Sequence, residues 1–130
     1  MRRARLEGAD LERYLDAMTS MLAQALSPHR IVLFGSFARG DQNRASDVDL
    51  VIVADTTLSF CDRIGWALQA VEGVVPAMPV EPLVYTPDEW RRMEGEGSSF
   101  VQLLQGEGRV LYERGSERDG SPAVARAGAS

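Results

Sequence analysis

Two aspartates, Asp47 and Asp49, stand two residues apart at the start of an apolar run that ends near Ala54. Residues two apart in a strand point to the same face, so these carboxylates would lie side by side, with Cα atoms roughly 6.6 Å apart. Aspartate oxygens are ligands that Mg²⁺ prefers, and two metal ions about 3.5 to 4 Å apart can hold both the entering and the leaving oxygen of a phosphoryl displacement. The pair therefore predicts metal-dependent nucleotidyl transfer.

A turn of mostly small residues closes the preceding apolar run and has the sequence Gly35-Ser36-Phe37-Ala38-Arg39-Gly40. Gly35 has no Cβ to block a phosphate, and Ser36 adds a hydroxyl and an N–H. A short helix starting here would present its free amides and its positive dipole end to the same anion. Arg39 could bind a phosphate oxygen or the carboxylates of its own loop. We predict that Gly35, Ser36 and Arg39 bind the nucleotide.

The spacing of these motifs, Gly-Ser followed ten residues later by Asp-x-Asp, resembles the signature of the DNA polymerase beta-like nucleotidyltransferase superfamily. The short, stand-alone minimal nucleotidyltransferases of the antitoxin type match best. The resemblance extends from about Leu11 to Glu113, because the stretches 80–89 and 108–112 also match. It implies an α/β nucleotidyltransferase fold, with a mixed β-sheet packed against helices.

In that family the Gly-Ser turn holds the triphosphate, the Asp-x-Asp pair binds magnesium, and a carboxylate on a later strand completes the site. Here the third position falls on Glu81, where the family usually has aspartate. The extra methylene moves the carboxylate outward by about 1.5 Å, whereas a catalytic base must lie within about 2.6 to 3.2 Å of the proton that it removes. We predict Glu81 as a metal ligand and as the acceptor's base; the alternative is a surface glutamate beside Pro82, whose presence indicates an edge strand.

The resemblance implies that the chain uses Mg²⁺, with two ions expected, to transfer AMP from ATP, or the nucleotide of another triphosphate, to a hydroxyl group. Relatives of this kind are often paired with a helical HEPN-domain ribonuclease, and some silence that toxin by adding AMP to a tyrosine, which would make this chain an antitoxin. Two alternatives stay open. One is a non-catalytic module that neutralises its partner by covering it. The other is a transferase that modifies an antibiotic hydroxyl, which would need another domain or an oligomer to form the acceptor pocket.

Composition narrows the choice of function further. The chain has 130 residues, which suits one domain, and its 45% hydrophobic and 25% charged content is ordinary for a globular protein. A net charge of -5 argues against strong nucleic-acid binding. All 14 basic residues are arginine, so a Walker-type lysine and Schiff-base catalysis are excluded. One histidine, His29, and one cysteine, Cys61, exclude a disulfide within the chain and a zinc site of several nitrogen and sulfur ligands. With no apolar segment of signal or membrane-spanning length, we expect a cytoplasmic protein.

Hydrophobic periodicity predicts strands that alternate with helices, which indicates an α/β fold. Three side-chain predictions accompany this pattern: Cys61 packs on the apolar face of its helix, Trp66 lies off that face, and Trp90 is in the core together with Phe100 and Tyr112. We expect one domain over residues 1–113 and a flexible tail over residues 114–130. The elements expected are helices over about 10–26, 58–71, 87–93 and 99–105, and strands over 30–34, 47–54, 80–85 and 109–113. A capping box at Thr86 should begin the third helix, and Gly73 and Gly106 should end the second and the fourth.

Overall fold

The computed structural model describes residues 5–115, so most of the predicted tail, residues 116–130, lies outside the described part. A single mixed sheet has the strand order β3-β2-β1-β4, in which only β2 and β3 are parallel. The strands are β1 (Arg30–Phe34), β2 (Val48–Val53), β3 (Val80–Tyr85) and β4 (Arg109–Glu113); the helices are α1 (Gly8–Leu26), α2 (Ser36–Arg39), α3 (Phe60–Ala70), α4 (Pro87–Gly95) and α5 (Ser99–Glu107).

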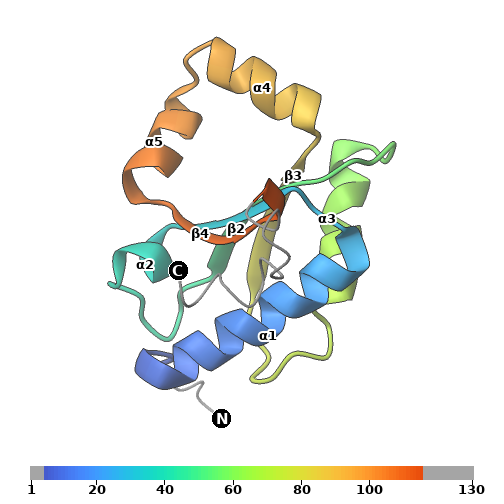
Figure 1. Ribbon diagram of the computed structural model, residues 1–130. Coiled ribbons are helices and arrows are strands. Elements are labelled where there is room, and N and C mark those ends of the chain that lie inside the picture. Colours follow the sequence, from blue (N-terminus) through green and yellow to red (C-terminus); the bar gives the residue numbers. More distant parts are fainter. Residues whose placement is uncertain (1–4, 116–130) are drawn as a thin grey trace.

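Helices pack on both faces of this sheet (Figure 1). Alternation along β2 sends Val48, Leu50 and Ile52 into a core shared with α1 and α3, whereas Val51 and Val53 pack on the other face, with residues of α4 and α5. Because period-two alternation assigns each strand residue to one face, this pattern also decides on which face the acidic residues of β2 lie. Among residues 5–115 no helix is long and apolar enough to cross a membrane.

Several predictions from the sequence are confirmed. All four strands occur where expected, although β2 begins at Val48 and leaves Asp47 just ahead of it. Strand β3, which contains Pro82, pairs only with β2 and is therefore an edge strand of the sheet. A capping box begins α4: Thr86 Oγ1 accepts from the Glu89 N–H at 3.2 Å, while the Thr86 N–H donates to Glu89 Oε1 at 2.8 Å.

The inward face of α3 was predicted wrongly. Cys61 and Leu68 are exposed, and the buried residues of this helix are Arg63 and Ala67. Trp66 is half-buried and packs against the core rather than lying away from it. Because an arginine was counted as polar, the periodicity pointed to the wrong stripe. The helix also ends at Ala70, with Val71 rather than Gly73 as its C-cap.

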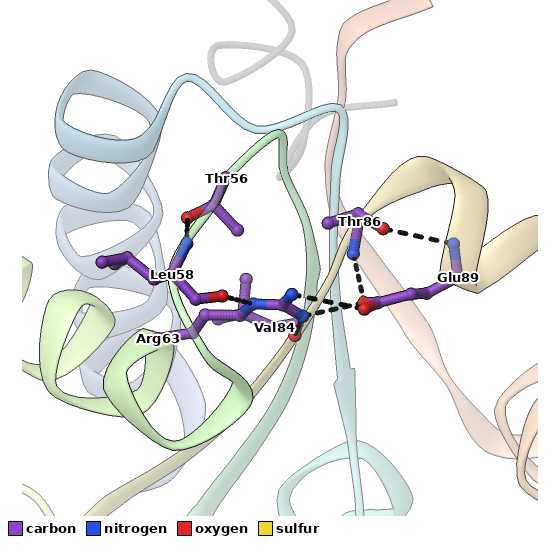
Figure 2. Close-up of polar contacts among 6 residues, drawn as sticks. All are labelled: Thr56, Leu58, Arg63, Val84, Thr86 and Glu89. Carbon is purple, nitrogen blue, oxygen red and sulfur yellow. Dashed lines mark hydrogen bonds and ion pairs between the residues drawn. The ribbon is translucent and has the colours of Figure 1, made fainter.

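Arg63 connects α3 to the end of β3 and to the start of α4 (Figure 2). Its guanidinium donates to Glu89 at 2.7 and 3.2 Å and to the carbonyl oxygens of Leu58 at 2.9 Å and Val84 at 3.0 Å. Only 8% of the Arg63 side chain is exposed. A buried guanidinium is tolerated when its N–H groups have acceptors, so this contact set explains how an arginine replaces an apolar residue on the inner face of α3.

The end of α5 lies beyond the predicted position. The helix includes Gly106 and ends at Glu107, with Gly108 as C-cap. A Cβ added to Gly108 would lie 2.4 Å from the Leu104 carbonyl oxygen and 2.8 Å from Val32 Cγ1. Glycine at this position therefore allows the last turn of α5 to approach β1 closely. The core placement of Trp90 and Tyr112 is confirmed, and Phe100 is partly buried against the same aromatic cluster as Trp90.

Candidate active site

The three predicted carboxylates lie around the start of β2. Asp49 alternates with the buried Val48 and Leu50, so it lies on the opposite face of the strand from them. Asp47 lies just ahead of the strand, close enough for its charge to act on Asp49. In the parallel register of β2 and β3, Asp49 is opposite Glu81. The sheet therefore brings together residues that are more than thirty positions apart in the chain.

The charges of these groups act on one another. Burial raises the pKa of Asp49 above its ordinary value, and the negative charges of Glu81 and Asp47 and a hydrogen bond with Glu81 raise this pKa further. The positive charge of Arg39 opposes the rise. Carboxylates this close repel one another unless a proton or a cation reduces their charge. The cluster therefore has an unbalanced negative charge that a bound cation would neutralise.

Oxygen donors of this kind fit magnesium. Over residues 5–115 no group of three or more His, Cys, Asp or Glu side chains is placed so that it could hold a metal ion. Mg²⁺ is usually bound through one or two carboxylates together with waters and substrate phosphates, rather than in an all-protein cage. A site of this type would be completed only with a triphosphate present. The excess negative charge around Asp49 would attract the Mg²⁺ ion.

Gly35 follows β1, whose last residue, Phe34, pairs with Asp49 in the sheet. Its backbone angles, φ 78° and ψ -157°, lie in a region that is essentially restricted to glycine. A Cβ at this position would lie 2.3 Å from Asp49 Oδ2. Gly35 is therefore needed for its backbone conformation and for the close approach of Asp49, reasons that differ from the phosphate access on which the sequence prediction rested.

Replacing Gly35 by Ala should lower transferase activity by about 100-fold, because the displaced turn and the Asp49 carboxylate would no longer have the productive geometry. Backbone strain should also destabilise the protein, by about 1 to 3 kcal/mol. Gly73→Ala is a suitable control, since its added Cβ meets nothing within 4 Å. Steady-state kinetics and urea unfolding measure the two effects. A Gly35→Ala protein with wild-type activity would contradict the geometry described here.

A fourth acidic residue, Glu107, reaches this site and was not predicted. Its Oε2 accepts a hydrogen bond from the Gly35 N–H at 2.8 Å, and its Oε1 lies 3.3 Å from Arg39 Nη1. Arg39 also donates to Asp41 at 3.2 Å. Hydrogen bonds with Asp41 and Glu107 raise the pKa of Arg39. The sequence left open whether Arg39 binds a phosphate or carboxylates of the protein. In the structure it contacts two carboxylates, those of Asp41 and Glu107.

No motif in the sequence indicates the role of Glu107, because its contacts cross 72 and 68 positions of the chain. Ser36 lies at the first position of α2 and is half-buried, as expected for the turn. His29 is beside Asp55, with Nε2 2.7 Å from Oδ2, at the opposite end of β1 from Gly35. His29 is therefore not placed to activate Ser36 as a nucleophile.

Residues 12–97 match the family model described as a nucleotidyltransferase domain. The chain belongs to the nucleotidyltransferase domain family. This nucleotidyltransferase is 35% identical over 85 residues to a protein of Methanocaldococcus jannaschii (strain ATCC 43067 / DSM 2661 / JAL-1 / JCM 10045 / NBRC 100440) that is provisionally named a protein adenylyltransferase; the match covers 64% of this chain and 77% of the relative. Membership of the family makes the chain an enzyme of the nucleotidyltransferase class.

Solved structures share the fold of this nucleotidyltransferase. A provisionally named nucleotidyltransferase of Sulfolobus solfataricus has a TM-score of 0.52 and 19% identity, covering 79% of this chain and 80% of its own. A toxin-antitoxin structure with AMP-PNP has a TM-score of 0.53 and 17% identity, and the match covers 87% of this chain and 82% of the other. A mutant of the toxin-antitoxin MntA-HpeT has a TM-score of 0.53 and 20% identity, and the match covers 87% of this chain and 80% of the other. At these identities the likeness establishes the fold, a mixed sheet with helices on both faces.

Proposed function

We propose that the chain transfers AMP from ATP, with Mg²⁺, to a hydroxyl group of a protein partner. The protein adenylyltransferase name of the Methanocaldococcus jannaschii relative supports the transferred group and the type of acceptor. The AMP-PNP in one of the fold neighbours supports an adenine nucleotide, and two neighbours are toxin-antitoxin structures. We further propose that the partner is a HEPN-type toxin, for which this chain would be the antitoxin.

The observation that carries the proposal is the pairing of Asp49 with Glu81 in the parallel register of β2 and β3, beside the Gly35 turn. The position of Glu81 opposite Asp49 supports the proposal, although the family usually has aspartate there. Glu81 is exposed, so an acceptor group on another protein can reach it from solvent. A longer and more exposed carboxylate suits an acceptor that approaches from outside the molecule.

The roles of the residues follow from their positions. Asp47 and Asp49 would hold Mg²⁺, which when bound neutralises the triphosphate and orients its α-phosphate. Glu81 would accept the proton of the acceptor hydroxyl, whose oxygen then bonds to the α-phosphorus. The bond from that phosphorus to the oxygen bridging to the β-phosphate breaks, and pyrophosphate leaves with the electron pair. The Gly35 N–H and the Arg39 guanidinium would contact the phosphate oxygens.

Label transfer tests the proposal directly. ATP labelled at the α-phosphate, Mg²⁺ and a HEPN-type protein encoded beside this chain should give a labelled partner. Replacing both Asp47 and Asp49 by Asn should abolish the label. A partner that stays unlabelled, or label that survives the double replacement, would contradict the proposal.

A second function, neutralisation of a partner by contact alone, is favoured by one feature, the glutamate at the third carboxylate position. The two functions respond differently to Asp47→Asn. A transferase should lose its inhibition of the partner's toxicity, whereas a binding module should keep it. Co-expression of the partner with wild-type chain or with Asp47→Asn, followed by cell counts, separates them.

Glu81 has a predicted role that kinetics can isolate. Glu81→Gln should lower kcat by about 100-fold or more, because general-base catalysis contributes factors of this size. Affinity for Mg²⁺ and AMP-PNP should change less than kcat, since Asp47 and Asp49 remain. Glu81→Asp, which restores the residue usual in the family, should retain much more activity than the Gln variant. Equal activity of wild type and Glu81→Gln would remove Glu81 from the catalytic set.

A further inference from the structure

Glu107 contacts the two donors that are proposed to bind the triphosphate, the Gly35 N–H and the Arg39 guanidinium. Its carboxylate accepts the Gly35 N–H at 2.8 Å and lies 3.3 and 3.4 Å from Arg39 Nη1. Only 18% of the Glu107 side chain is exposed. A carboxylate, like a phosphate oxygen, is an anionic acceptor for an amide N–H and for a guanidinium. The side chain of Glu107 therefore stands where an anionic ligand would be recognised.

We infer that Glu107 is an internal competitor for the triphosphate, and that nucleotide binding displaces its carboxylate from Gly35 and Arg39. This inference rests on the proposed function. The Gly35 amide has one hydrogen, so a phosphate oxygen and Glu107 cannot both accept it at full strength. A triphosphate would also be repelled by a carboxylate held at the same donors. Binding therefore requires Glu107 to move, and ATP affinity is reduced by the stability of the contact with Glu107.

The position of Glu107 in its helix supports this view. Glu107 is the last residue of α5, a helix of nine residues with no basic residue in its last turn. A negative charge at a helix C-terminus is unfavourable, because the helix dipole is negative there. The carboxylate is held in place by contacts with Gly35 and Arg39, which belong to a different part of the chain. These contacts are the ones that a more highly charged anion can replace.

Two charge partners surround Arg39 in the described structure. Asp41 and Glu107 both contact its guanidinium. Removing the charge of Glu107 would leave Arg39 paired with Asp41 alone. The positive potential at the turn would increase, and the carboxylates that bind the cation would not be altered.

Calorimetric titration of the full chain with AMP-PNP and Mg²⁺ tests the inference. Glu107→Gln keeps an oxygen acceptor for Gly35 but removes the charge, so it should bind AMP-PNP about tenfold more tightly than wild type. Glu107→Asp keeps the charge but shortens the side chain by a methylene, and it should also bind more tightly. Glu96→Gln, which removes a negative charge from an exposed position at the end of α4, should bind like wild type.

An amide NMR spectrum gives a second measure. The Gly35 N–H signal of wild type should shift when AMP-PNP and Mg²⁺ are added, and Glu107→Gln should shift it before any nucleotide is present. Wild-type or weaker affinity in a folded Glu107→Gln protein overturns the inference while leaving the proposed function intact. The same affinity gain in Glu96→Gln overturns it as well, because net charge alone would then explain the gain. Absence of AMP-PNP binding in every protein overturns both the nucleotide site and the inference.

Discussion

Replacement of Asp49 by Asn is expected to lower the rate of nucleotidyl transfer by about 1,000-fold and to raise the melting temperature. The loss follows because a group that stabilises charge in the reacting complex is removed, and losses of this size are typical of such removals. Transfer of label from ATP measures the first effect, and thermal unfolding at pH 7 measures the second. Asp16→Asn, at an exposed position on α1, is the matched control and should change neither quantity appreciably.

The expected gain in stability of Asp49→Asn follows from the direction in which the pKa of Asp49 is shifted. Its pKa in the folded protein is above the ordinary value of 3.8, because of burial and of the charges of Glu81 and Asp47. The folded protein therefore binds this proton more tightly than the unfolded chain does. Stability from this group is present at low pH and is lost as pH rises from the unfolded pKa through the folded one. Asparagine carries no charge and should recover up to about 1 kcal/mol after solvent screening. A lower melting temperature for Asp49→Asn would contradict this reading.

Arg63→Ala is expected to reduce the free energy of unfolding by about 2 to 3 kcal/mol, because three acceptors lose a donor and each hydrogen bond contributes about 1 kcal/mol. The variant removes the donor that Arg63 supplies to the carbonyl oxygens of Leu58 and Val84 and to the carboxylate of Glu89, which keeps only the Thr86 N–H. Urea unfolding measures the effect. Arg92→Ala, at an exposed position on α4, should cost less than about 0.5 kcal/mol. A loss below about 1 kcal/mol for Arg63→Ala would show that the contacts in Figure 2 contribute little.

The same pair predicts a dependence on pH. The hydrogen bond from Arg63 lowers the pKa of Glu89 below its ordinary value of 4.5, against the opposing effect of burial. The unfolded chain therefore takes up this proton first as the pH falls. The stability that Glu89 contributes is present above its unfolded pKa and is lost as the pH falls through the folded pKa. Unfolding measured between pH 6 and pH 3 should show a smaller acid loss in Arg63→Ala than in wild type.

Local features of the sequence were sufficient to predict the strands and the start of α4. The run from Ile31 to Phe34 and the capping box at Thr86 are local patterns, and the structure has both where the residues indicated. The face of α3 could not be found in this way. Arg63 is buried because Glu89 and two carbonyl oxygens, from other parts of the chain, supply acceptors, and periodicity contains no information about such partners.

The candidate site likewise contains residues that the sequence indicated and residues that only the structure brought together. The prediction that Asp47 and Asp49 lie side by side came from strand alternation, a relation that the sequence contains by itself. Proximity of Glu81 to Asp49 was implied only by a family resemblance, and the parallel register of two strands decided it. Glu107 reaches Gly35 and Arg39 through the packing of α5 against β1, which Gly108 permits. Spacing along the chain determines which side chains share one strand face, whereas contacts between distant segments depend on how the elements pack.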